Sequence, residues 1–425
     1  MTNEQSTLLA LLSNALFNKS IDLKQDDYNW EKIYQEAKEQ AVAPLVFHTL
    51  DQDRIDSMPS ELYETWRKNA TFTLVNNVRI SHNHLLVHQW MTENQIPYVI
   101  LKGVASSHYY PVPEYRALGD VDFLIPRDYM QKVDSIMKKH GLTPAENGHG
   151  FHVAYTGNRM CMEAHFDVTD VPNGKTGDAI HMYLEDIFQM SSMQMTSGGE
   201  MVLPSPFHHG LVLLLHTCRH MMESGIGLRH LCDWAVFENS FTDNEFRNLF
   251  EEKLREMGLW RFAQELTKVC ILYLGVEDRE WVRNDGLDSE SSAISPDKEI
   301  HGENEFALTV ELMEDILCSG NFGMKDTNRG IESLLISKSG KNDLQSPADV
   351  LLQFYRSVNN VVYYYWPFVK KARILLPVGW VYFGGRRIIR GITGKRKPLN
   401  VKNMIEGASE RRNIYKELHL FETDS

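Results

Sequence analysis

Two aspartates stand one residue apart in the apolar stretch "RALGDVDFLI", residues 116–125, and this pattern restricts the fold more than any other feature. The stretch has the composition of a buried strand, in which side chains alternate between two faces. Asp120 and Asp122 would project to one face, and Val121 and Phe123 to the other. Two partly buried carboxylates about 7 Å apart by strand rise repel each other unless a cation neutralises them. The pattern therefore predicts a cation site on this strand.

The chemistry of the two side chains indicates which cation would bind. Carboxylate oxygens suit Mg²⁺ or Mn²⁺, which accept phosphate oxygens of a substrate as further ligands. A two-metal site for phosphoryl transfer needs a third acid. The segment "MEAHFDV" places Glu163, His165 and Asp167 on one face if it is a strand, with Glu163 as the first choice and Asp167 as the reserve. A lone Asp-x-Asp pair also occurs by chance in surface strands, but the preceding "LKG" predicts a turn whose backbone can approach a phosphate.

The remaining periodicity predicts an α+β fold. Apolar residues recur at helical spacing from Ser6 to about Gln95, where glycine is absent, and they predict three or four helices. Four strands follow in "IPYVILKG", "GDVDFLIP", "FHVAYTG" and "MCMEAHFDVTD", the last two as a hairpin. Helical spacing then returns and persists. We expect a small mixed sheet between an N-terminal helical segment and a larger C-terminal helical domain, with boundaries at 1–95, 96–205 and 206–425.

The composition fits a protein of the reducing cytoplasm. The 425 residues include 43% apolar residues and five cysteines without a CxxC pair, which argues against a disulfide framework or a zinc ribbon. The first residues lack the basic region and cleavage site of a secretory signal, so none is expected. The longest charge-free apolar run near the C-terminus falls short of the ~18 residues of a membrane span. A net charge of −13 would repel nucleic acid over most of the surface.

Two segments depart from the average composition. Residues 275–305 hold ten acidic and three basic residues, the composition of a mobile surface loop. Residues 361–398 mix aromatic side chains with Lys and Arg, which suits an anionic membrane surface or an RNA. The alternative is that the aromatic residues pack on the helical domain and leave the cations solvated.

A run of motifs resembles a known family. "YVILKGVASSHYYPVPEYRALGDVDFLIP" followed by "MEAHFDV" is similar to the DNA polymerase β type nucleotidyltransferase superfamily, and in particular to a bacterial branch of uncharacterised nucleotidyltransferases. The segments "AVAPLVFHTL" and "LLLHTCRHMMESGIGLRHLCDWAVF" are also similar to that branch, so the resemblance covers most of the chain. Its most specific positions are Lys102, Gly103, Arg116, Asp120, Asp122, Glu163 and His165.

The resemblance implies a Mg²⁺-dependent (or Mn²⁺-dependent) nucleotidyltransferase. Such an enzyme transfers a nucleoside monophosphate from a nucleoside triphosphate, expected to be ATP, to a hydroxyl of a small molecule or a protein, and releases pyrophosphate. Asp120 and Asp122 are expected to hold the metal of the triphosphate, and Glu163 to complete a second metal site. A catalytically silent nucleotide-binding or partner-binding module with the same fold is the alternative, and peripheral membrane scaffolding is a third.

The expected phosphate contacts lie near the turn that follows the first strand. The Gly-Ser or Gly-Gly turn that is usual in the wider superfamily is replaced by Lys102-Gly103, so Lys102, Gly103, Ser106 or Ser107, and Arg116 are the expected phosphate-binding residues. His165 would orient Glu163, contact phosphate or act as a structural hydrogen-bond partner.

The helical part supplies further candidates. His209, His216 and His220 share one helical face, which suits a zinc or di-metal site, but no HExxH motif accompanies them and an apolar core position is the stronger interpretation. Arg219, Arg229 and Asp233 are expected to line the cleft, with Arg229 toward the nucleotide. An internal ion pair explains them equally well.

Overall fold

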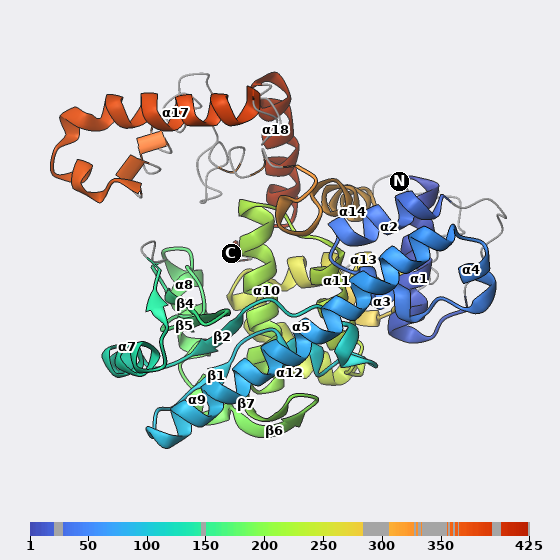
Figure 1. Ribbon diagram of the computed structural model, residues 1–425, viewed down its shortest axis with the longest axis horizontal. Helices are drawn as coiled ribbons and strands as arrows, with labels where there is room; N and C mark the ends of the chain where they lie inside the picture. Colours follow the sequence, from blue (N-terminus) through green and yellow to red (C-terminus); the bar gives the residue numbers. More distant parts are fainter. Residues whose placement is uncertain are drawn as a thin grey trace.

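The fold was analysed in a computed structural model. It describes residues 1–20, 29–145, 150–283, 306–326, 365–392 and 401–423, together with 329, 333, 355, 358–359 and 362–363. Over these residues the protein is a mostly helical α+β structure with one small mixed sheet (Figure 1). The fold class predicted from the sequence is confirmed at this level, whereas the three domain boundaries stay predictions.

The N-terminal part contains five helices, more than the three or four that apolar spacing predicted. They are α1 (Asn3–Phe17), α2 (Trp30–Glu39), α3 (Ala43–His48), α4 (Gln52–Asp56) and α5 (Ser60–Glu93). The long helix α5 joins two cores, because Trp66 of its first half packs in the helical core and Val87 and Met91 of its second half pack against the sheet.

The sheet has five strands in the order β1-β2-β5-β4-β3. They are β1 (Val99–Ile100), β2 (Val121–Leu124), β3 (Thr143–Pro144), β4 (His152–Gly157) and β5 (Met160–His165). β1 is antiparallel to β2, β2 is parallel to β5, and β4 and β5 form the predicted hairpin. The connections contain α6 (Val104–Ser107), η1 (Pro113–Tyr115), η2 (Arg127–Tyr129) and α7 (Met130–Lys139). The central pair β2 and β5 therefore carries both acidic motifs.

Apolar alternation fixes one face of the sheet. Val121 and Phe123 of β2 are fully buried in a core that they share with α5 and α7. Asp122 consequently points to the opposite face, as the sequence predicted.

A second hairpin was not predicted. After α8 (Lys175–Leu184) and α9 (Ile187–Met190), strands β6 (Ser192–Thr196) and β7 (Gly199–Leu203) pair through a tight turn. Met201 and Leu203 of β7 are buried in the core of the sheet, and β7 packs against α5 and β1. The hairpin thus extends the hydrophobic cover of that core.

The C-terminal part is helical. It comprises α10 (Pro206–Glu223), α11 (Leu228–Glu238), α12 (Asp243–Glu256), α13 (Trp260–Leu274), η3 (Glu280–Val282), α14 (Ala307–Ser319), η4 (Asn321–Gly323), η5 (Pro367–Lys370), η6 (Arg373–Leu375), α17 (Leu376–Ile392) and α18 (Val401–Glu417). Most of the acidic segment predicted to be a mobile loop, residues 284–305, lies outside the described residues. No helix among the described residues is long and apolar enough to cross a membrane.

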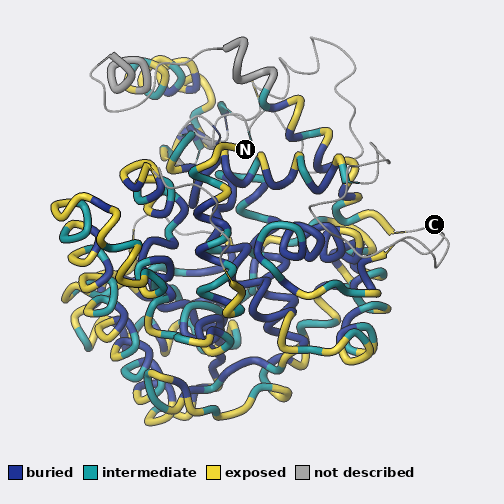
Figure 2. Tube along the Cα trace, turned by 90° about the vertical axis from the view of Figure 1, so that its right-hand side faces the viewer, coloured by how far each residue is buried: buried dark blue, intermediate teal, exposed yellow. Residues whose placement is uncertain are grey.

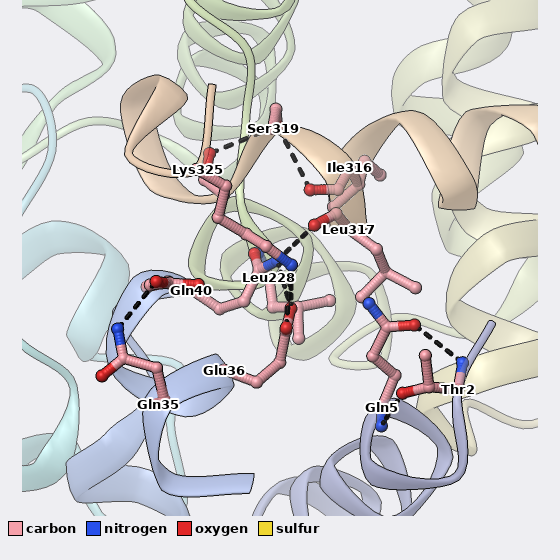
Figure 3. Close-up of polar contacts among 12 residues, drawn as sticks. Thr2, Gln5, Gln35, Glu36, Gln40, Leu228, Ile316, Leu317, Ser319 and Lys325 are labelled. Carbon is pink, nitrogen blue, oxygen red and sulfur yellow. Dashed lines mark hydrogen bonds and ion pairs between the residues drawn. The ribbon is translucent and has the colours of Figure 1, made fainter. Parts of the chain in front are cut away.

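The N-terminal and C-terminal helices share one core. Leu8, Leu11 and Leu12 of α1 are buried in the same cluster as residues of α10, α11, α13 and α14, and buried positions run through the body of the molecule (Figure 2). Polar contacts reinforce this packing (Figure 3): the Gln40 amide accepts from Leu228 N at 2.9 Å and donates to Leu317 O at 3.2 Å. The helices that precede the sheet in the sequence and those that follow it therefore pack together in one core.

Candidate active site

The acidic site begins with the turn between β1 and α6. Leu101 N donates to Asp122 O at 3.1 Å and extends the pairing of β1 with β2. The chain then turns at Gly103, whose φ of +64° and ψ of −104° favour glycine. This turn brings Lys102 to the carboxylate of Asp122, with Nζ 3.0 Å from Oδ1.

Three carboxylates meet on the face of β2 and β5 that lies opposite Val121 and Phe123. Asp122 is paired with Glu163 in the parallel register, and Asp120 precedes β2. One carboxylate oxygen from each of Asp120, Asp122 and Glu163 lies within 4.8 Å of the others. The structure thus brings together the three acids that the sequence analysis selected. Asp167, the reserve, pairs instead with Arg127 on the surface.

The charges in this cluster are only partly balanced. The negative charge of Asp122, followed by burial, raises the pKa of Asp120 to about 6. Burial acts to raise the pKa of Asp122 as well, but Lys102 and His165 outweigh it and hold this pKa well below its ordinary value. One ammonium and one imidazole therefore satisfy Asp122, while Asp120 retains unfavourable repulsion that an additional cation would relieve.

His165 lies between two of the acids. Its Nε2 is 3.0 Å from Asp122 Oδ1 and 3.5 Å from Glu163 Oε2. Burial lowers the pKa of His165, but the hydrogen bonds to Asp122 and Glu163 outweigh burial and raise it. His165 thus positions both carboxylates from within the sheet.

A second histidine at the site was missed by the sequence analysis. His152 Nε2 is 3.6 Å from Glu163 Oε2, and His152, Glu163 and His165 form a second group whose ligand atoms lie within 4.8 Å of one another. His152 and His165 are directly paired across the β4–β5 hairpin. Counting back from the predicted turn near Gly157 would have found this pairing.

Arg116 is engaged in an internal ion pair. Its Nη2 is 2.6 Å from Asp233 Oδ2 and its Nε donates to Asp233 Oδ1 at 3.0 Å. Tyr110 Oη donates to the same Oδ1 at 2.7 Å, and all three side chains are buried. Asp233 therefore anchors the loop before β2 to α11. Its ion-pair partner is Arg116, which was expected at a phosphate, and not Arg219 or Arg229 of the helical part.

The serines of α6 differ in their contacts. Ser107 Oγ donates to Val104 O at 3.0 Å. Ser106 is 2% exposed, and its Oγ has no hydrogen-bond partner among the described residues. Buried hydroxyls ordinarily have a hydrogen-bond partner, so the Ser106 hydroxyl is available for a hydrogen bond to a bound ligand.

A surface that we call the basic wall lies beside the acids, built from the turn at Gly103, α10, α11 and η4. We use this name for Lys102, His216, His220, Arg229, His230 and the ring of Phe322. Lys102 Nζ is 3.4 Å from His216 Nδ1, and the His216 and His220 rings lie 4.2 Å apart. Phe322, in the left-handed region with φ of +53°, packs against His220 and His230 at 4.8 and 5.0 Å. The wall therefore runs from the acid cluster to Phe322.

Lys102 pairs with Asp122, whereas Arg229 is the cation of the wall without an ion pair among the described residues. Arg229 lies 5.2 Å above the Phe322 ring; its Nε is unpartnered, and no carboxylate forms an ion pair with it among the described residues. Burial and then the charge of Lys102 lower the pKa of His220 to about 3. Arg219 contacts Glu223 at 3.4 Å and stacks on Phe151. A free guanidinium and neutral imidazoles make this surface suitable for an anion.

The histidines do not support a zinc site. Among the described residues, no group of three close ligand atoms includes His209, His216 or His220. His209 is buried and stacks on Tyr109 at 5.2 Å, as expected of a core residue.

Of three comparisons with known proteins, one identifies a family. No curated protein and no solved structure matches the chain. A family model described as uncharacterised nucleotidyltransferase matches residues 26–275, which include α2 to α13 and all of the acids discussed above. The chain belongs to this family of uncharacterised nucleotidyltransferases.

Proposed function

We propose that the protein is a Mg²⁺-dependent or Mn²⁺-dependent nucleotidyltransferase that uses a nucleoside triphosphate, with ATP as the first candidate. The observation that carries the proposal is the meeting of Asp120, Asp122 and Glu163, whose oxygens lie within 4.8 Å of one another. Membership of the nucleotidyltransferase family supports the same reaction class.

The residues present fit a divalent metal. The donor set is carboxylate oxygen, which Mg²⁺ and Mn²⁺ prefer. The charge of Asp122, followed by burial, raises the pKa of Asp120 to about 6 although Lys102 lowers it, which supports a place for an additional cation. Asp120, Asp122 and Glu163 would hold the metal, which supplies charge neutralisation on the phosphates and a lower pKa for the acceptor hydroxyl.

The other side chains position the substrates. Lys102 would exchange its contact with Asp122 for one with a phosphate oxygen, and Arg229 with the basic wall would bind the rest of the triphosphate. His165, 3.0 Å from Asp122 and 3.5 Å from Glu163, would keep both carboxylates oriented. Gly103 and Ser106 lie on the same turn and helix as Lys102 and complete the proposed phosphate contacts.

In the reaction, the acceptor oxygen forms a bond to the α-phosphorus. The bond from this phosphorus to the oxygen that bridges to the β-phosphate breaks, pyrophosphate leaves, and the hydroxyl proton passes to water. The acceptor is a hydroxyl of a small molecule or a protein.

The test is label transfer by the purified chain. Incubation with each α-labelled nucleotide, Mg²⁺ and a cell extract should label an acceptor and release pyrophosphate, and chelation of the metal should stop both. Asp122→Asn should abolish transfer, whereas Asp128→Asn, the same change at an exposed acid outside the cluster, should not. A catalytically silent module would instead bind nucleotide equally with and without Mg²⁺, and Asp122→Asn would change nothing.

A further inference from the structure

The C-terminal arm, which we define as residues 362–363 and 365–392, has a small core of its own. Val362, Val369 and Leu376 are buried together, and Trp366, Trp380 and Phe383 are among the residues packed against them. A Cβ at Gly379 would lie 2.5 Å from Val362 Cγ1, so α17 packs closely on the preceding segment. One face of α17 is therefore already occupied.

A second apolar face of the arm is exposed. The side chains of Ile374, Val378, Val381 and Tyr382 are 87%, 56%, 76% and 50% exposed. Val378, Val381 and Tyr382 follow helical spacing, so they form one stripe on α17. Figure 1 shows α17 extending away from the sheet and the helices around it. This stripe thus has no partner within the described part of the chain.

The same region has a charge opposite to that of the whole protein. Residues 350–405 contain eleven of the 44 basic residues and none of the 57 acidic ones, although the chain as a whole carries −13. Lys371, Arg373 and Arg386 are exposed beside or on α17. The arm therefore combines an exposed apolar stripe with exposed cations that precede and follow this stripe in the sequence.

We infer that the arm docks on the surface of an anionic lipid bilayer. The aliphatic and aromatic stripe would enter the headgroup region, and the cations would contact lipid phosphates. A nucleic acid would leave Ile374, Val378 and Val381 in water, and a second basic arm would be repelled by the first. This inference is independent of the proposed enzymatic activity.

The experiment is co-sedimentation of the full chain with vesicles. Vesicles of phosphatidylcholine and phosphatidylglycerol in equal amounts should carry the protein down, and vesicles of phosphatidylcholine alone should not. Val378→Glu with Val381→Glu should weaken binding by about tenfold or more, because two charges enter the apolar stripe. Lys371→Gln, Arg373→Gln and Arg386→Gln together should weaken it by about a hundredfold, from about fivefold for each cation.

The matched control lies on α5. Val75 and Val78 are 65% and 72% exposed, so Val75→Glu with Val78→Glu adds the same charge to the body of the molecule. This control should bind vesicles as the unchanged chain does, and thermal melting should show that both double variants are folded. Equal binding by the α17 and α5 variants would overturn the inference, as would no binding by the intact chain. Self-association or RNA binding that is lost only in the α17 variant, without vesicle binding, would also overturn it.

Discussion

Asp122 of β2 and Glu163 of β5 are directly paired in the parallel register, although α7, β3 and β4 separate them in the sequence. This pairing, with Asp120 at the start of β2, concentrates three carboxylates on one face of the sheet. The repulsion among these carboxylates is unfavourable when no cation is bound.

Asp120→Asn should stabilise the metal-free protein while abolishing transfer. The pKa of Asp120 is raised to about 6, so the folded protein holds this proton more tightly than the unfolded chain. Stability is therefore lost as pH rises from about 4 to about 6, and the asparagine removes this loss. Urea unfolding at pH 7 without metal should show a gain of about 1 kcal/mol, after allowance for solvent screening. The gain should vanish below pH 4, and its absence at pH 7 would contradict the electrostatic account of the cluster.

Arg229→Gln should weaken nucleotide binding more than the chemical step. The guanidinium has no carboxylate ion-pair partner among the described residues and lies at the end of the basic wall. Loss of one charged phosphate contact should raise the nucleotide KM by about tenfold, with a smaller effect on kcat. Arg67→Gln removes an exposed arginine that pairs with Glu64 and is the matched control. An unchanged KM would exclude Arg229 from the phosphate site.

Arg116→Met should destabilise the fold through Asp233. The change leaves the buried Asp233 carboxylate without its bidentate partner, which costs about 3–5 kcal/mol. The double variant Arg116→Met with Asp233→Asn should recover much of this loss, because the uncompensated charge is gone. Urea unfolding of the two single variants and the double variant measures the coupling. Additive losses would show that Arg116 acts outside this ion pair.

His209→Phe should reduce the acid sensitivity of the protein. Burial lowers the pKa of His84 to about 4 and those of His209 and His220 to about 3, whereas the unfolded chain takes up these protons near pH 6.5. The unfolded state therefore binds more protons below pH 6.5. As the pH decreases below this value, the free energy of unfolding decreases by up to about 1.4 kcal/mol per pH unit for each histidine. Within the part of the chain that the structure describes, both ring nitrogens of His209 lack hydrogen-bond partners, so phenylalanine should also stabilise the fold at pH 7. Thermal melting at pH 7 and pH 5 checks both effects, and an unchanged difference between the two pH values would contradict the assignment.

Local pattern was sufficient to predict strands β1, β2, β4 and β5 and the face to which Asp122 and Glu163 point, but not β3, β6 or β7. The alternation in "DVDF" and "MEAH" places Asp122 and Glu163 opposite the apolar side chains, as observed. Pattern alone could not show that β2 and β5 are neighbours, because short strands do not specify their partners. The β6–β7 hairpin was missed although "TSGGE" is a turn sequence, because the exposed Met193 and Met195 obscure its alternation.

Contacts between distant segments account for the remaining differences. Arg116 was expected at phosphate because the motif contains it, but its partner Asp233 lies on α11, far away in the sequence. The basic wall likewise depends on how α10 and η4 pack beside the turn at Gly103. Such contacts arise from tertiary packing and leave no local signal.

Direct measurement of metal binding tests the central claim, that Asp120, Asp122 and Glu163 form one metal centre. Calorimetric titration with Mn²⁺, in the presence of a nucleotide analogue that cannot be cleaved, should show saturable binding by the unchanged chain. Glu163→Gln should weaken it by about tenfold or more, since one ligand charge is lost. Asp167→Asn should bind as the unchanged chain does, because Asp167 pairs with Arg127 outside the cluster. Binding that survives Glu163→Gln, or that is lost in Asp167→Asn, would contradict the account.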